Sequence, residues 1–149
     1  MKIVLASDHA GFPLKKEVIG ALKEIKASFE DLGCHSENSV DYPDFASQVA
    51  RKVSAGEAER GILLCGTGVG MAITANKFKG VRAAAIGDLF TAKASREHND
   101  LNVLCLGGRV VKPVVAREIV KTFLQTPFAG GRHEKRVEKI KKIEDKNCP

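Results

Sequence analysis

Residues 61–71 read Gly61-Ile62-Leu63-Leu64-Cys65-Gly66-Thr67-Gly68-Val69-Gly70-Met71, and this segment sets the architecture of the chain. A short aliphatic run ends at a cysteine and passes through alternating glycines into a stretch of helical spacing, which predicts a helix over 72–78. This order is typical of a buried strand that turns directly into a helix, as in the βα units of a parallel sheet. Glycines also expose backbone N–H groups at the helix N-terminus, where negative charge is stabilised, so an oxyanion site is plausible there.

Further aliphatic runs alternate with amphipathic segments along the rest of the chain. A helix over about 132–144 closes it, with an apolar stripe that is narrow for a core helix. The alternation predicts a single three-layer α/β/α (Rossmann-like) domain over residues 1–149, built on a five-stranded parallel sheet. In such sheets ligands bind beyond the carboxyl ends of the strands. We expect the strands at residues 3–6, 29–32, 61–64, 83–86 and 103–106.

Composition narrows the class of protein. The 149 residues are 44% hydrophobic and 28% charged, as expected for one globular domain. No apolar run approaches the roughly 20 residues of a membrane span, and charge follows Met1 too soon for a signal peptide, so we expect a cytoplasmic protein without a membrane partner. Four widely spaced cysteines predict neither a metal site nor a disulfide framework.

The formal net charge of +6 invites a nucleic-acid interpretation, but its distribution disfavours one. Residues 130–149 hold seven Lys and Arg against four Asp and Glu, which is half of the excess. No Phe, Tyr or Trp is interleaved with them, so the means of stacking bases is lacking. We therefore expect a small anionic ligand and no nucleic acid.

The glycine-rich segment leaves several interpretations open. Cys65 precedes a helix N-terminus that favours the thiolate, and could act as a base or nucleophile. It equally fits a small buried hydrophobe, and the glycines equally fit close packing of helix on strand. Met71 stands where a dinucleotide fingerprint needs glycine, and the Gly-Lys-Ser/Thr ending of a P-loop is absent. Asp88, about 20 residues further on, fits a ribose-binding carboxylate or a helix N-cap, so a nucleotide sensor is the alternative function.

Polar residues elsewhere add weaker signals. Asp8 follows the first strand, where polar groups act as helix caps or ligand contacts, and Asp8 could be both. Arg132 and Arg136 lie four residues apart on one helical face and could grip a phosphate dianion, although an ordinary solvated basic face explains them as well. His98 near a helix end is by itself more typical of a surface residue.

Taken together, these motifs resemble the type B ribose-5-phosphate isomerase family, which also contains isomerases of six-carbon aldose and ketose phosphates. The resemblance implies interconversion of D-ribose 5-phosphate and D-ribulose 5-phosphate through a cis-enediolate, in the non-oxidative branch of the pentose phosphate pathway. It implies no metal and no organic cofactor. The resemblance runs nearly end to end, through residues 7–11, 41–43, 65–70, 75–77, 95–100 and 130–137.

The resemblance also implies roles for individual residues. Cys65 is the base, Thr67 assists it, and His98 opens the sugar ring. It further implies a homodimer or dimer of dimers whose active site is shared between subunits, with the terminal helix carrying its arginines to a partner. The sugar phosphate is bound at the positions of Asp8, His9, Tyr42, Gly66, Gly68, Gly70, Asn99, Arg109, Arg132 and Arg136.

Overall fold

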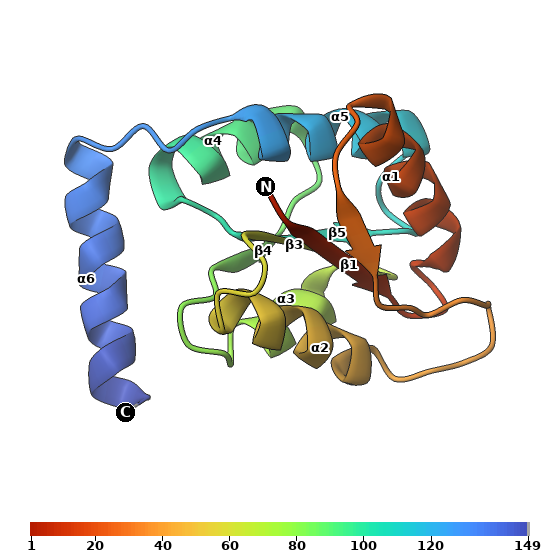
Figure 1. The fold of residues 1–149 in the computed structure, drawn as a ribbon, viewed down its shortest axis with the longest axis horizontal. Coiled ribbons are helices and arrows are strands. Elements are labelled where there is room, and N and C mark those ends of the chain that lie inside the picture. The colour runs from red at the N-terminus through yellow and green to blue at the C-terminus, as the bar shows by residue number, and fades with distance from the viewer. Residues whose placement is uncertain (149) are drawn as a thin grey trace.

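The computed structural model describes residues 1–148, in which strands and helices alternate along the chain (Figure 1). All the predicted strands are present, and each end lies within one residue of its predicted position. The strands are β1 (Ile3–Ser7), β2 (Phe29–Asp31), β3 (Arg60–Cys65), β4 (Ala83–Ala85) and β5 (Val103–Gly107). The helices are α1 (Phe12–Glu24), α2 (Tyr42–Ser54), α3 (Val69–Ala75), α4 (Leu89–Asn99), α5 (Pro113–Gln125) and α6 (Arg132–Asn147).

The strands form one parallel sheet in the order β2-β1-β3-β5-β4. β3 lies at its centre, and its last residue, Cys65, is in register with Gly107 at the end of β5. The carboxyl ends of β1, β3 and β5 therefore meet at one edge of the sheet, where ligands bind in folds of this kind.

Helices cover both faces of the sheet, so the predicted three-layer α/β/α fold is confirmed. α1, α4 and α5 lie on one face and α2 and α3 on the other (Figure 1). Alternate residues of β1 enter the two cores: Ile3 and Leu5 pack with α1 and α5, whereas Val4 and Ala6 pack with α2 and α3. Burial on both faces explains why the strands read as continuous apolar runs.

The start of α3 differs from the sequence prediction. The helix begins at Val69, three residues before the predicted start. Gly68 adopts φ 82°, a left-handed conformation that glycine reaches without a steric penalty, and it forms the N-cap of α3. The glycine-rich loop is therefore shorter and more sharply turned than its composition suggests.

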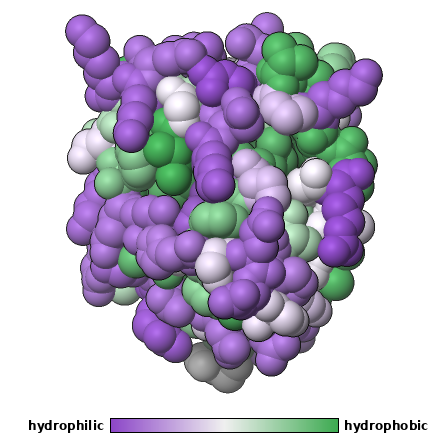
Figure 2. All heavy atoms as spheres, turned by 90° about the vertical axis from the view of Figure 1, so that its right-hand side faces the viewer, coloured by the Kyte–Doolittle hydropathy of each residue, from purple (hydrophilic) through white to green (hydrophobic). Residues whose placement is uncertain are grey.

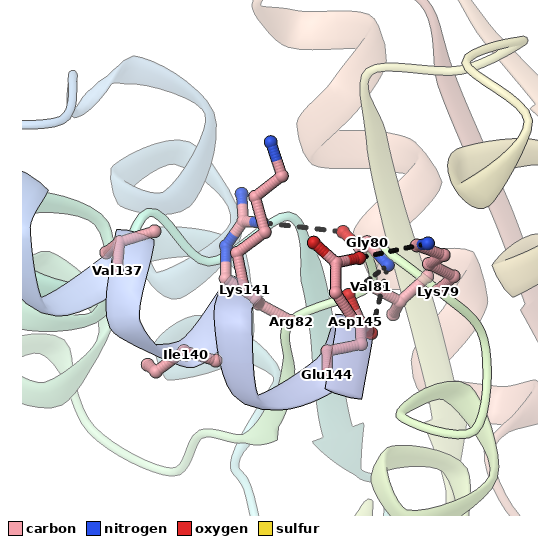
Figure 3. A pocket seen from close by; sticks show the side chains of 9 residues that line it. All are labelled: Lys79, Gly80, Val81, Arg82, Val137, Ile140, Lys141, Glu144 and Asp145. Carbon is pink, nitrogen blue, oxygen red and sulfur yellow. Dashed lines mark hydrogen bonds and ion pairs between the residues drawn. The ribbon is translucent and has the colours of Figure 1, made fainter. Parts of the chain in front are cut away.

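α6 stands outside the three layers, at one side of the molecule (Figure 1). None of its residues is buried, and Ile140 and Ile143 are 48% and 63% exposed. The Glu144 carboxylate accepts two hydrogen bonds from the backbone N–H of Gly80, at 2.9 and 3.1 Å. An ion pair between Lys79 and Asp145 at 2.9 Å supports the same contact, and a cavity lies beside it (Figure 3).

The surface on the side remote from α6 is mainly hydrophilic, with small apolar groups interspersed (Figure 2). Within residues 1–148, no helix has the length and hydropathy that crossing a bilayer requires.

Asp88 forms the N-cap of α4. Its two carboxylate oxygens accept hydrogen bonds from the backbone N–H of Thr91 at 2.7 Å and from the Thr91 hydroxyl at 2.8 Å. Of the two roles open to Asp88 from the sequence, the structure therefore favours the helix cap. The nucleotide-sensor alternative loses its main support.

Asp88→Ala is expected to lower the melting temperature at neutral pH by roughly 2–4 °C, because the first turn of α4 loses its acceptor. The backbone and side-chain hydrogen bonds from Thr91 hold the pKa of the Asp88 carboxyl below its usual value. A lowered pKa means that the stabilisation is present above about pH 4 and is lost as the pH falls through the folded-state pKa. Thermal unfolding at about pH 7 and about pH 3 should show the larger difference at pH 7; an equal difference at both would contradict the cap.

Candidate active site

A cavity of about 490 Å³ opens at the carboxyl edge of the sheet. Loops after β1, β3 and β5 and the first turns of α2 and α3 form its wall. The structure thus brings together most of the residues that the family resemblance singled out. The cavity is lined by Asp8, His9, Ala10, Tyr42, Cys65, Gly66, Thr67, Val69, Gly70, Ile73 and Arg109.

Cys65 lies at the end of β3 and is only 5% exposed. The backbone N–H of Gly68 donates a hydrogen bond to its Sγ at 3.1 Å. Gly68, the residue with positive φ at the N-cap of α3, therefore joins the start of α3 to the Cys65 sulfur.

The other cysteines do not line the cavity. Cys105 is fully buried on β5, and burial, with a smaller contribution from the charge of Cys65, raises the pKa of its thiol. Cys105 therefore remains protonated and packs as an apolar side chain. Cys34 is buried beside Ser7, and Cys148 is exposed at the end of α6.

Asp8 and His9 are held in place by backbone groups. The Asp8 carboxylate accepts a hydrogen bond from the N–H of Gly11 at 2.9 Å, which fixes the turn before α1. The Nδ1 atom of His9 accepts one from the N–H of Val40 at 3.1 Å. Nδ1 is thus an acceptor, so the neutral ring carries its proton on Nε2, which can donate to an anionic ligand.

Two glycines, Gly66 in the loop after β3 and Gly70 in the first turn of α3, are closely approached by side chains of the site. A Cβ atom on Gly70 would lie 2.4 Å from Cε1 of Tyr42, so glycine at this position lets the tyrosine ring lie against the first turn of α3. A Cβ atom on Gly66 would lie 3.3 Å from a terminal nitrogen of Arg109. These close approaches place a phenol and a guanidinium group at the mouth of the cavity.

The loops after β3 and β5 are joined to each other. The N–H of Gly108 donates to the carbonyl of Cys65 at 2.8 Å, and the N–H of Arg109 donates to the carbonyl of Gly66 at 3.0 Å. Arg109 is therefore positioned relative to Cys65 by backbone contacts, which vary less than side-chain contacts.

Four of the predicted site residues lie elsewhere within the chain. His98 and Asn99 end α4, which starts at the carboxyl edge and finishes near the opposite edge of the sheet. Arg132 and Arg136 are exposed on the first turns of α6. Within one chain, none of the four lines the cavity that holds Cys65.

Sequence reasoning missed two groups of residues. Val69 and Ile73, which are 52% and 59% exposed, form an apolar wall of the cavity. Val69 and Ile73 are four residues apart and so share one face of the helix, whereas Met71 and Ala75 are buried on another face. This spacing was the signal from which the apolar wall could have been predicted. His133 was also missed: its ring stacks on His98 with centroids 4.3 Å apart.

Comparisons with known proteins identify the family. Residues 3–140 match the family model described as Ribose/Galactose Isomerase. The chain belongs to this family. Within the family, it is 48% identical over 145 residues to ribose-5-phosphate isomerase B of Escherichia coli, with 97% of each chain covered. It is 52% identical over 148 residues to a putative sugar phosphate isomerase of Bacillus subtilis, with 99% of each covered.

Solved structures of the family share the fold. Ribose-5-phosphate isomerase B of Clostridium thermocellum superposes with a TM-score of 0.94 at 51% identity, covering 98% of this chain and 99% of that one. The Mycoplasma genitalium isomerase with bound ribulose-5-phosphate gives a TM-score of 0.93 at 44% identity, covering 98% and 97%. The family resemblance inferred from the motifs is confirmed, and so is the fold.

Proposed function

We propose that this chain is an aldose-ketose isomerase that interconverts D-ribose 5-phosphate and D-ribulose 5-phosphate in the non-oxidative branch of the pentose phosphate pathway. The observation that carries the proposal is the Cys65 sulfur, which receives the Gly68 N–H at 3.1 Å within a cavity of a ribose/galactose isomerase family member. A base beside amide donors is what moving a hydrogen between C1 and C2 requires.

Ring opening comes first, because ribose 5-phosphate exists mainly as a furanose. The C1–O4 bond breaks as a proton reaches O4, and the O1 hydroxyl loses its proton as the C1 carbonyl forms. An imidazole can perform both transfers because it donates and accepts protons near neutral pH. His98 is assigned this step.

Isomerisation follows on the open chain. The Cys65 thiolate removes the proton from C2, and negative charge develops on O1 of the cis-enediolate. Backbone N–H groups from Gly66 to Gly70 stabilise this charge, with Thr67 assisting the base. The proton returns to C1 while the O2 proton passes to O1, which yields the ketose. No electrons are gained or lost overall, so the step needs no oxidant or reductant.

The phosphate dianion and the sugar hydroxyls need separate partners. We assign the phosphate to His9, Arg109, Arg132 and Arg136, and the hydroxyls to Asp8, Tyr42 and Asn99. His9 and Arg109 already line the cavity, whereas both arginines of α6 lie outside it within one chain. A second copy that brings its α4 and α6 to the cavity completes the site.

The proposal therefore includes a homodimer, or a dimer of dimers, in the cytoplasm. The exposed Ile140 and Ile143 on α6 support it, because contact with a second subunit would remove them from water. Sedimentation measurements test the assembly: a monomer with full isomerase activity would overturn the shared site.

The function is tested by an assay of the purified protein on ribose 5-phosphate and allose 6-phosphate in the presence of EDTA. We expect ribulose 5-phosphate to form, and the rate to be unchanged by EDTA. Absence of turnover on both sugars would overturn the proposed function, and loss of activity with EDTA would overturn the metal-free mechanism. The ratio of the two rates reports the tolerance for a sixth carbon.

Arg136→Ala is expected to raise the KM for ribose 5-phosphate by about tenfold or more while kcat changes little, because a charge-assisted hydrogen bond to the phosphate contributes about 1.5–3 kcal/mol. Steady-state kinetics at constant ionic strength measure the effect, with Arg132→Ala as the companion variant. Lys139→Ala serves as control because Lys139 is exposed on the same helix. An unchanged KM in both arginine variants would contradict the phosphate contact.

A further inference from the structure

Two histidines, one in the last turn of α4 and one in the first turn of α6, stack on each other. His98 lies in the last turn of α4 and His133 in the first turn of α6. Their ring centroids are 4.3 Å apart and their planes differ by 12°. Within residues 1–148, no hydrogen bond joins either ring to another group, so the contact is between faces and leaves the nitrogen edges free.

Contacts at the end of α4 fix the segment that leads into α6. Arg96, which is 2% exposed on α4, donates through Nε to the carbonyl of Thr126 at 3.1 Å and forms an ion pair with Asp100 at 2.8 Å. The N–H of Ala129 donates to the carbonyl of Glu97 at 3.1 Å. The segment that leads into α6 is thus fixed against the end of α4.

The far end of α6 is fixed independently. The contacts of Glu144 with Gly80 and of Asp145 with Lys79 hold its last turns against the loop before β4 (Figure 3). Because both ends are attached, His133 is presented to His98 by a supported helix rather than by a free one.

The electrostatic surroundings of His133 disfavour its charged form. Burial lowers the pKa of His133, and the positive charges of His98, Arg132 and Arg136 lower it further, against an opposing effect from Glu97. The N-terminus of a helix also disfavours a cation, whereas the C-terminus of a helix favours one. Above its lowered pKa, His133 is neutral.

We propose that His133 is a positioning residue for ring opening, which stacks on the face of His98 and keeps the nitrogen edges of His98 directed at the sugar. A hydrogen-bonded partner would occupy one nitrogen, and ring opening needs both proton donation and acceptance. A neutral stacked ring fixes the plane of His98 without occupying either nitrogen. This inference rests on the role proposed for His98.

The test compares two substrates and two variants. 4-Deoxyribose 5-phosphate lacks the hydroxyl that closes the furanose, so it enters the site as an open chain. His133→Ala should lower kcat/KM about tenfold on ribose 5-phosphate and less than about twofold on 4-deoxyribose 5-phosphate, each relative to the unsubstituted protein. His133→Phe retains a flat ring and should restore most of the activity on ribose 5-phosphate. Lys135→Ala, an exposed neighbour, is the control.

Each outcome separates this inference from the proposed function. Suppose that the unsubstituted protein turns over ribose 5-phosphate but that His133→Ala lowers kcat/KM equally on both substrates. The positioning role is then wrong, and the proposed isomerase function is unaffected. If His133→Phe loses as much activity as His133→Ala, His133 acts through its nitrogens and the stacking role is wrong. If the unsubstituted protein is inactive, the proposed function itself fails.

Titration of the histidines by NMR gives a readout that a merely structural role would not produce. The pKa of His133 should lie below the value of about 6.5 for an exposed histidine. A lowered histidine pKa means that the neutral stack persists above that pKa and is lost as the pH falls through it. A value for His133 at or above about 6.5 would contradict the neutral partner.

Discussion

Replacing Cys65 with alanine is expected to lower kcat for ribose 5-phosphate by roughly 100- to 10,000-fold, the range over which a positioned general base acts. The sulfur accepts the C2 proton in the transition state, so removal of the sulfur should leave KM within about threefold of its original value. Steady-state kinetics with isothermal titration of ribose 5-phosphate measure both quantities. Near-normal turnover in Cys65→Ala would exclude Cys65 as the base.

Two further variants make this result specific. Cys148→Ala is the matched control, because Cys148 is exposed at the end of α6 and no catalytic role is assigned to it. Cys65→Ser keeps the size of the side chain and a hydrogen-bond acceptor for Gly68, but its hydroxyl group does not ionise near neutral pH. We expect Cys65→Ser to be nearly as impaired as Cys65→Ala, which would show that the anion rather than the contact is required.

His98→Asn is expected to lower kcat/KM for ribose 5-phosphate by about 100-fold, because an amide cannot move protons at O1 and O4. The loss on 4-deoxyribose 5-phosphate should be much smaller, since that sugar needs no ring opening. Equal losses on the two sugars would remove the ring-opening role. Lys93→Ala, on an exposed position of the same helix, should leave both rates unchanged.

The combined substitution of His98 and His133 tests whether the pair acts as a unit. If His133 acts only through His98, adding His133→Ala to His98→Asn should produce little further loss on ribose 5-phosphate. Residues that act together show such non-additive effects. A further tenfold loss would indicate that each acts separately.

The sheet was largely predictable from the sequence, because strands buried on both faces must read as continuous apolar runs. Ile62, Leu63 and Leu64 show this most clearly, since all are fully buried at the centre of the sheet. The start of α3 was not predictable from spacing. It depends on the left-handed conformation of Gly68, and glycine tolerates many conformations, so its presence does not specify which is adopted.

The candidate site was predictable in part. Polar residues after β1 and β3 had to reach the same edge of the sheet, so Asp8 and Thr67 could be placed near Cys65 from topology alone. Tyr42 and Arg109 reach the cavity by close approach to glycines, which no pattern of residue types specifies.

The stack of His98 on His133 depends on the path of the linker before α6. Gly130 and Gly131 both adopt positive φ values, of 67° and 54°, and turn the chain into the helix. Two adjacent glycines predict a turn but not its direction. The pairing of these histidines could therefore be found only in three dimensions.

The contact between Tyr42 and Gly70 limits how this enzyme could adapt to larger sugars. The phenol ring already lies against the backbone of Gly70, where a single methyl group would overlap it, so the ring has no room to move closer to α3. The exposed side chains of Val69 and Ile73, which also line the cavity, meet no such constraint. We therefore expect a longer carbon chain to be accommodated by smaller side chains at these two positions.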